Sequence, residues 1–461
     1  MNAIMRARCR GSRLRAAATL AVITGILLTA ACSTDDLLEV TDPDIINPSD
    51  VQSPAGAEAV RLGGLARFNA ATSGAESLFL LGGLFSDEWV NGDSFIARWE
   101  VDQRVITTAN TFLTDANRVL HRTRLSAEQA VELLDTYSPN APAWQVAEML
   151  FIQAYVINLI AEHYCDGIVF SSVIEGREEY GSPITTAAAL ERALELANDG
   201  LARITGTTAS DLRVRHALQI TRGRILLNLN RPADAGTAVA GVPTSYAYTM
   251  QHSQTTQSNA FWSFNNNARR YSVGAAEGTN GLDFATANDP RVPVCLGGSP
   301  ACAGIGVTQN RRDDLSQPLH VQMLWPTRES PVAIIRGVDA RMIEAEAQLR
   351  ANNAAGALAT LNTARATIVG LTPLLDAGTD AARVDQLFRE RAFWQFGRGM
   401  RTGDLRRLVR QYQRPQNTVF PTGAWHKGGS YGTDVNVPVP FDEQNNPNLP
   451  PGNETCLNRN A

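Results

Sequence analysis

Aromatic and amide side chains that fall together on segments predicted to be loops are the groups most able to bind a ligand. The face of an aromatic ring can stack on the apolar face of a sugar ring, while asparagine, aspartate and arginine bind its hydroxyl groups. The same tryptophans could instead fill the protein core, as large apolar side chains commonly do. The candidate ligand-binding residues are Trp89 with Asn91, Trp262 with Phe264 and Asn265, and Trp325 before Pro326.

Paired carboxylates are the next groups that could carry chemistry, because a glycosidase needs two of them at a fixed separation. Asp87 with Glu88 and Glu390 with Asp404 qualify by residue type, but the sequence sets no distance between their carboxyl groups. The chain contains no HExxH, P-loop or dinucleotide-binding motif, and its six histidines are scattered without metal-ligand spacing. We therefore predict that the protein is not an enzyme and has no catalytic residue, cofactor or metal site.

Charge excludes one class of partner. The 461 residues carry a formal net charge of −5, and removing residues 1–31, which hold five arginines and no acid, takes it to −10. An acidic protein is poorly suited to a phosphate backbone, so we expect no nucleic-acid partner. Arg401 and Asp404, three residues apart, predict a structural ion pair at a helix start rather than an anion site.

The N-terminus reads as an export signal. An arginine-rich start precedes an apolar run that is too short for a comfortable membrane span, and Ala30-Ala31 then leads to Cys32. This order resembles a bacterial lipobox, although Thr29 stands where leucine is usual; an ordinary secretory signal is the alternative. We predict a signal peptide over 1–31, lipidation of Cys32, and a polar tether over 32–53.

Export implies an oxidising compartment, in which cysteines pair. Cys295 and Cys302 bracket a loop-forming segment and have no histidine nearby, so a disulfide is favoured over a zinc site. A second disulfide between Cys165 and Cys456 is possible but has little support from the sequence.

Apolar periodicity indicates a chain of helical hairpins. Residues 337–412 contain two helices of roughly 15 residues separated by Asn352-Asn353, followed by two more helices that end before Pro415. One hairpin cannot bury its own apolar face, so related pairs should occur upstream. Helical patterns do recur, at 54–71, 110–120, 126–134, 143–164, 186–204, 211–229 and 233–240.

Two stretches break the helical pattern. Residues 241–332 are rich in glycine, asparagine, threonine, glutamine and proline, yet they also carry many aromatic residues. Long insertions of this kind in a compact domain are usually functional or disordered, and so many aromatics argue against disorder. Residues 413–461 form a second irregular region.

Seven blocks follow one another in order along nearly the whole exported chain: Cys32 with DLLEV, AWQVAEMLFIQAYVINLIAEHYCDGIVF, ALQITRGRILLNLNRPADAGTAV, ANDPRVPV, VDARMIEAEAQLRANNAAGALATLNTARA, LFRERAFWQFGRGMRTGDLRRL and VNVPVPFDEQNNPNL. In this order they resemble the SusD/RagB family of outer-membrane nutrient-binding lipoproteins. Gln395, Gly397, Val437 and Val439 depart from the usual residues of two of the blocks.

The resemblance implies a mainly α fold in which tetratricopeptide-like helical hairpins form a scaffold for long loop-rich insertions. Residues 54–461 would then be one SusD-like domain, with the scaffold in 54–240 and 333–412 and the ligand face in 241–332 and 413–461. It further implies a lipid-anchored protein on the outer membrane, facing the cell exterior. Its partners would be a SusC-type, TonB-dependent transporter and a nutrient, most often a glycan or oligosaccharide. Peptides or other nutrients are alternatives, as is an envelope scaffold that binds no ligand.

Overall fold

Helices carry most of the described chain, and most of them lie where the apolar periodicity places them. The computed structural model describes residues 51–174, 177–449 and 456–460. The predicted signal peptide (1–31), Cys32 and nearly all of the predicted tether lie outside these residues. The helices are α3 (Pro54–Ser73), α4 (Leu78–Phe85), α5 (Ile96–Gln103), α6 (Thr111–Tyr137), α7 (Ala143–His163), α8 (Thr186–Arg203), α9 (Ala209–Asn228), α10 (Pro232–Ala238), α11 (Pro300–Ala303), α12 (Gly337–Arg350), α13 (Ala354–Arg365), α14 (Asp380–Gln395), α15 (Arg401–Arg410) and α16 (Gln416–Val419), with a π-helix η1 (Trp262–Asn267) and a 3-10 helix η2 (Phe441–Asn445).

Strands in the described part of the chain are short and pair only as two-stranded antiparallel ladders. The pairs are β1 (Trp89–Asn91) with β5 (Tyr271–Val273), β2 (Ser172–Ile174) with β3 (Arg177–Glu179), β4 (Ala247–Met250) with β8 (Val332–Arg336), and β6 (Val294–Leu296) with β7 (His320–Gln322). The ladder of β1 with β5 joins residues 89–91 to the loop-rich region 241–332, and the ladder of β4 with β8 brings the two ends of that region together. The predicted fold class, mainly α, is therefore confirmed.

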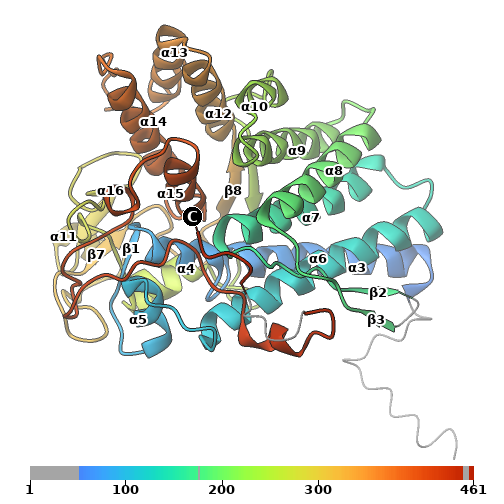
Figure 1. Cartoon of the computed structure of the whole chain (residues 1–461), viewed down its shortest axis with the longest axis horizontal. Coiled ribbons are helices and arrows are strands. Elements are labelled where there is room, and N and C mark those ends of the chain that lie inside the picture. Colours follow the sequence, from blue (N-terminus) through green and yellow to red (C-terminus); the bar gives the residue numbers. More distant parts are fainter. Residues whose placement is uncertain (1–50, 175–176, 450–455, 461) are drawn as a thin grey trace, which may run out of the picture. The chain divides into compact units, whose positions relative to one another are not determined.

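Stacked helical pairs form the scaffold. α6 packs against α3 and α7, α8 and α9 pack against α7 and each other, and α12 packs against α10, α13 and α14. Asn352, at the predicted turn between α12 and α13, and Asn230, between α9 and α10, adopt the left-handed conformation, with φ of 58° and 59°. In Figure 1 these helices occupy the right and the top, while residues 241–332, coloured green-yellow to orange, lie mainly on the left near α5 and α16.

α7 is the centre of the scaffold. Among the described residues it is the one helix long and apolar enough to span a membrane, but 83% of its most apolar window is buried inside the protein. Two of its polar side chains bond inside the protein: Glu162 accepts hydrogen bonds from Arg224, and Asn158 accepts one from Asn228 at 2.9 Å. The prediction of a buried core helix over 143–164 is confirmed.

The two helices predicted over 110–120 and 126–134 are in fact one helix, α6. No glycine or proline interrupts residues 111–137. Leu120, Thr123 and Ala127 continue one buried face through the predicted break, so packing favours an unbroken helix.

Buried ion pairs join α12, α14 and α15. Asp404 accepts hydrogen bonds from Arg391 at 2.7 and 2.8 Å and from Arg407 at 2.9 Å. Arg407 also pairs with Glu346 of α12. Burial acts to raise the pKa of Asp404, but the charges of Arg391 and Arg407 outweigh it and lower that pKa to about 2. These helices therefore meet through fixed charges as well as apolar contacts.

The predicted ion pair between Arg401 and Asp404 is wrong. Arg401 pairs with Asp87, which follows α4, through two hydrogen bonds of 2.7 and 2.8 Å. Glu390, considered above as a catalytic carboxylate, accepts a hydrogen bond of 2.7 Å from Arg291 and is buried. These side chains hold the scaffold to the segments that surround it.

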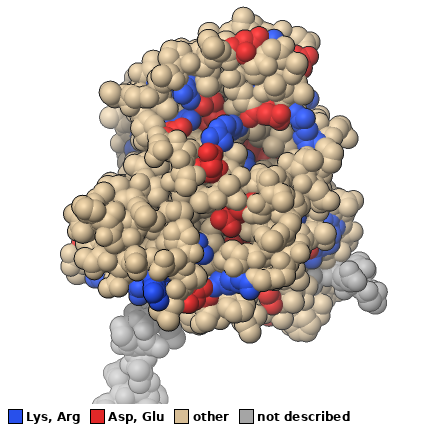
Figure 2. All heavy atoms as spheres, turned by 90° about the vertical axis from the view of Figure 1, so that its left-hand side faces the viewer, with Lys and Arg blue, Asp and Glu red and all other residues tan. Residues whose placement is uncertain are grey.

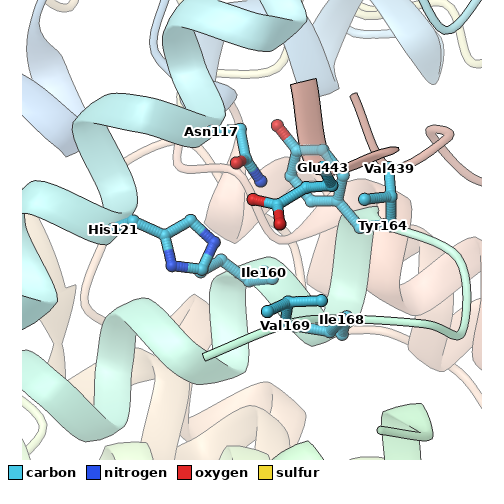
Figure 3. A pocket seen from close by; sticks show the side chains of 8 residues that line it. All are labelled: Asn117, His121, Ile160, Tyr164, Ile168, Val169, Val439 and Glu443. Carbon is cyan, nitrogen blue, oxygen red and sulfur yellow. The ribbon is translucent and has the colours of Figure 1, made fainter. Parts of the chain in front are cut away.

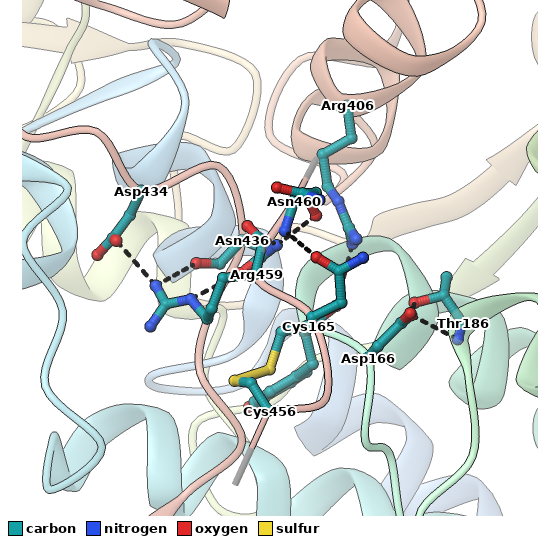
Figure 4. Close-up of a disulfide and its surroundings, with 11 residues drawn as sticks. Cys165, Asp166, Thr186, Arg406, Asp434, Asn436, Cys456, Arg459 and Asn460 are labelled. Carbon is teal, nitrogen blue, oxygen red and sulfur yellow. Dashed lines mark hydrogen bonds and ion pairs between the residues drawn. A yellow bond between two sulfur atoms is a disulfide. The ribbon is translucent and has the colours of Figure 1, made fainter. Parts of the chain in front are cut away.

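Both candidate disulfides are formed. Cys295 and Cys302 close a seven-residue loop beside β6, and Cys165 pairs with Cys456 across 291 residues of sequence. Figure 4 shows the second disulfide where the C-terminal segment crosses the end of α7, with Arg459 turned toward Asp434. The C-terminal segment is thus tied covalently to the central helix of the scaffold.

Candidate ligand-binding site

The loop-rich side of the protein is the face that Figure 2 presents. Large areas of uncharged side chains cover much of this face, while charged side chains of both signs gather in a hollow in the upper half of the view. Residues 241–332 contribute the short strands β5 to β7 on this side. Aromatic side chains of this region also pack together, Phe261 on Trp325 and Phe264 on Tyr271.

An open groove of about 430 Å³ lies within this region. Its volume is in the range of small-ligand sites. The indole of Trp262 is half-buried, and the guanidinium of Arg328 lies 5.1 Å from the centre of its ring. The residues that line the groove are Gln254, Trp262, Pro326, Thr327, Arg328 and Glu329. The groove therefore combines an aromatic surface with amide, hydroxyl and charged groups.

The π-helix η1 sets the orientation of Trp262. A π-turn is wider than an α-turn and often occurs at functional sites, because it redirects side chains within a short segment. Here Trp262 at its start borders the groove, whereas Asn265 and Asn266 point into the protein and are buried. Gln322 binds both asparagines and donates a hydrogen bond to the carbonyl of Trp325 at 3.0 Å.

Asn265 is not available to a ligand in this structure. Its Nδ2 donates to the carbonyls of Tyr271 and His320 at 2.8 and 3.0 Å, and its Oδ1 accepts from the backbone of Gln322 at 2.9 Å. Phe264 is half-buried and packs edge-on against Tyr271. The predicted pairing of Trp262 with Phe264 and Asn265 as one exposed cluster is therefore wrong, since only Trp262 borders the groove.

Trp89 and Trp325 belong to a buried aromatic column. Trp89 is fully buried and stacks on Phe261 at 6.2 Å, and Phe261 stacks on Trp325 at 4.2 Å. Asn91 is also fully buried, and its Oδ1 accepts a hydrogen bond from the backbone of Asp93. The expectation that Trp89 and Asn91 lie exposed on a loop is wrong, because the ladder of β1 with β5 draws them into the interior. Trp325 is buried as well, through its stacking on Phe261.

The buried aromatic column holds one wall of the groove in place. Trp325 immediately precedes Pro326, which lines the groove, so the buried indole anchors the groove wall. Gly397, with φ of 69°, lets the chain pass the Trp325 ring, since a Cβ placed there would lie 3.0 Å from it. The tryptophans predicted to touch ligand thus divide into one groove residue and two supporting residues.

Sequence reasoning missed Arg328, Gln254 and Pro326 as groove residues. A turn over residues 327–330 follows Pro326, and in it the backbone N–H of Thr327 donates to Oγ of Ser330 at 3.0 Å. A tight turn directly after a buried tryptophan places its middle residues outward, and this signal could have pointed to Arg328.

A second cavity, of about 10 Å³, is large enough for one water molecule only. Figure 3 shows His121, Asn117, Tyr164 and Glu443 around it. Burial and the charge of Arg124 lower the pKa of His121 to about 3. Burial, followed by the nearby Asp442, raises the pKa of Glu443. Burial thus disfavours the charged forms of both side chains, and the void, which Ile160, Ile168, Val169 and Val439 also line, is too small for a nutrient.

Two further observations bear on catalysis and metals. Gly428–Gly432 has the spacing GxSxG, but His426 directs Nε2 to Asp102 at 2.7 Å and Nδ1 toward Arg312 at 3.5 Å. Neither ring nitrogen is then placed to activate Ser430. Within the part of the chain that the structure describes, no group of three or more His, Cys, Asp or Glu side chains could hold a metal ion.

Comparison with known proteins identifies the fold. No protein-family model matches the chain, and no curated protein matches it. Among solved structures, a SusD superfamily protein from Parabacteroides distasonis matches with a TM-score of 0.64 at 12% identity, over 87% of this chain and 99% of that one. A SusD-like protein from Bacteroides fragilis matches with a TM-score of 0.60 at 14% identity, over 87% and 96% of the two chains.

A third solved structure, described as a SusD-like carbohydrate binding protein from Bacteroides vulgatus, matches with a TM-score of 0.54 at 13% identity. The match covers 77% of this chain and 83% of that one. At such identities the similarity is one of fold. The SusD-type fold implied by the sequence blocks is confirmed.

Proposed function

Because the chain has a SusD-type fold, we propose that it binds a carbohydrate in the Trp262 groove and presents it to a transporter in the outer membrane. The observation that carries this proposal is the half-exposed indole of Trp262 beside Arg328, in an open groove on the loop-rich face. That one solved neighbour is described as carbohydrate binding is consistent with a sugar ligand.

The chemistry of the groove suits recognition without covalent change. The faces of Trp262 and Pro326 offer apolar surface, and Arg328, Gln254 and Thr327 offer hydrogen-bonding groups for hydroxyls. The groove is open rather than enclosed, so an internal unit of a longer chain could enter it. Its lining residues include no histidine or cysteine, and Glu329 is its one carboxylate, which leaves no carboxylate pair for glycoside hydrolysis.

The remaining parts of the proposal concern where the protein works. Lipidation of Cys32 would anchor the protein to the outer membrane, facing the cell exterior, since several buried acyl chains give stable anchoring. A SusC-type, TonB-dependent transporter would receive the bound carbohydrate. The alternatives are a peptide-binding role and an envelope scaffold without ligand, and binding measurements distinguish them from carbohydrate binding.

Replacing Trp262 with alanine should weaken carbohydrate binding by about thirtyfold, because truncating a central aromatic contact costs about 2 kcal/mol. Trp144→Ala is the matched control: Trp144 is also half-buried and its ring centre lies 5.3 Å from the guanidinium of Arg61, but it belongs to α7 and does not line the groove. The measurement is calorimetric titration of the purified protein with a panel of neutral and acidic oligosaccharides.

Binding that is lost in Trp262→Ala and kept in Trp144→Ala supports the proposal. Equal loss in both variants, or none in either, would contradict the placement of the site. Binding of peptides without any saccharide would contradict the ligand class, and a stable transporter complex without any ligand would favour the scaffold role.

A further inference from the structure

Asn259 forms hydrogen bonds to both walls of the groove, which are the start of η1 with Trp262 and the turn with Arg328. It is fully buried and lies three residues before Trp262. Its Oδ1 accepts a hydrogen bond of 3.0 Å from the backbone N–H of Trp262. Its carbonyl accepts two more, from the backbone N–H of Ser263 at 3.0 Å and from its Oγ at 2.9 Å. These three bonds fix the start of η1.

The remaining donors of Asn259 face the opposite wall. Its backbone N–H donates to the carbonyl of Arg328 at 2.8 Å, and its Nδ2 donates to the carbonyl of Ser330 at 2.8 Å. Both carbonyls belong to the turn that begins at Thr327. One buried side chain therefore bonds to the backbone of Trp262 and to the backbone of the turn that carries Arg328.

We propose that Asn259 is a positioning residue that sets the spacing between the indole of Trp262 and the guanidinium of Arg328, and so shapes the groove before ligand arrives. The inference rests on the proposed function in taking this groove as the ligand site. An amide is required at this position, because one end must accept from an N–H while the other donates to a carbonyl.

The chain supplies a matched control in Asn436, which lies outside η1. This residue is equally buried, and it too donates from Nδ2 to backbone carbonyls while accepting at Oδ1. Its partners are Arg459 and Asn460, neither of which lines the groove. Asn→Asp at either position keeps an acceptor, removes the amide donor and buries a carboxyl group. Both variants should therefore lower stability for the same reason, but only the variant at Asn259 should loosen the contacts between the two walls of the groove.

The test is oxidative footprinting of the full exported chain, with peptide mass spectrometry of Trp262 and of Trp144 as an internal reference. In Asn259→Asp, the oxidation rate of Trp262 relative to Trp144 should rise by about fivefold, the change expected from one lost hydrogen bond. In Asn436→Asp, the ratio should stay at its original value even though the melting temperature falls. An unchanged ratio in Asn259→Asp, or an equal rise in both variants, would overturn the inference.

Hydrogen exchange of the unaltered protein covers the case in which a variant does not fold. The amides of Asn259, Trp262 and Ser263 should exchange together and slowly, because Asn259 donates or accepts all three bonds. Exchange of the Trp262 amide at the rate of an unstructured peptide would overturn the inference.

The footprint needs no ligand, so it separates this inference from the proposed function. If no saccharide binds but the ratio rises only in Asn259→Asp, the positioning role stands and the proposed function fails. If saccharides bind at Trp262 but the ratio does not respond to Asn259→Asp, the function stands and the positioning role fails.

Discussion

Removing the Cys165–Cys456 disulfide should lower the free energy of unfolding by about 5 kcal/mol, against about 2 kcal/mol for the Cys295–Cys302 disulfide. The physical reason is the length of chain that each bond closes, 291 and 7 residues, because a longer closed loop restricts the unfolded chain more. The comparison is between two double variants, Cys165→Ala/Cys456→Ala and Cys295→Ala/Cys302→Ala. Alanine avoids placing a new hydroxyl group in the buried site of Cys165.

The measurement is chemical denaturation at neutral pH, extrapolated to zero denaturant. The larger effect requires the C-terminal segment to unfold together with the scaffold. Backbone hydrogen bonds between this segment and the end of α7 favour this: Val437 donates to His163 at 2.8 Å and accepts from Cys165 at 2.9 Å, and Leu457 donates to Asp166 at 2.9 Å. Equal losses in the two double variants would show that the C-terminal segment detaches before the scaffold unfolds.

Glu88 should make the protein less stable as the pH rises from about 4.5 to about 8. The side chain is buried; one carboxyl oxygen accepts a hydrogen bond from the backbone of Gly397 at 3.0 Å, and the other has no partner. Burial, which outweighs the Gly397 hydrogen bond, raises its pKa from 4.5 to about 8, with a further contribution from the charge of Asp87.

The direction of this pH effect follows from the protonation of Glu88 in the folded and the unfolded chain. Between these pH values the unfolded chain has lost the Glu88 proton while the folded chain keeps it, so each further rise in pH favours unfolding. The loss is complete near pH 8 and amounts to at most about 5 kcal/mol. Glu88→Gln should remove this slope, so that its stability relative to the original protein grows from pH 5 to pH 8 and then levels.

Glu346→Gln is the matched control for Glu88. Glu346 is equally buried, and although burial acts to raise its pKa, the charges of Arg407 and Arg391 outweigh burial and lower it. That variant should lose stability without changing the slope between pH 5 and pH 8, because the stabilising charge of Glu346 is already complete there. A difference between Glu88→Gln and the original protein that stays constant from pH 5 to pH 8 would contradict the buried, proton-holding state of Glu88.

The scaffold was predictable because its signals are local and repeated. The apolar stripes of 143–164, 186–204 and 337–365 specify helices, and turn residues such as Asn352 mark their ends. The error over α6 arose because Ser126 and Gln129 have the spacing of a helix-start capping box by chance, although no helix-breaking residue supported a break there. The fold could therefore be inferred from pattern together with the order of the family-like blocks.

The groove was only partly predictable because exposure depends on contacts distant in sequence. Trp89 and Trp262 have similar loop-like neighbours, yet β1 pairs with β5 and carries Trp89 inward, while η1 leaves Trp262 beside the groove. The asparagines after Trp262 looked like ligand-binding groups, but Asn265 bonds to strands β5 and β7 through contacts that no local pattern reveals.

Footprinting with the tightest-binding saccharide present tests the central claim most directly. Bound saccharide should protect Trp262 and Pro326 from oxidation and leave Trp144 and the buried Trp89 unchanged, because only the first two line the groove. Protection that falls elsewhere on the protein, with Trp262 as reactive as before, would show that the ligand binds at another face and would contradict the account.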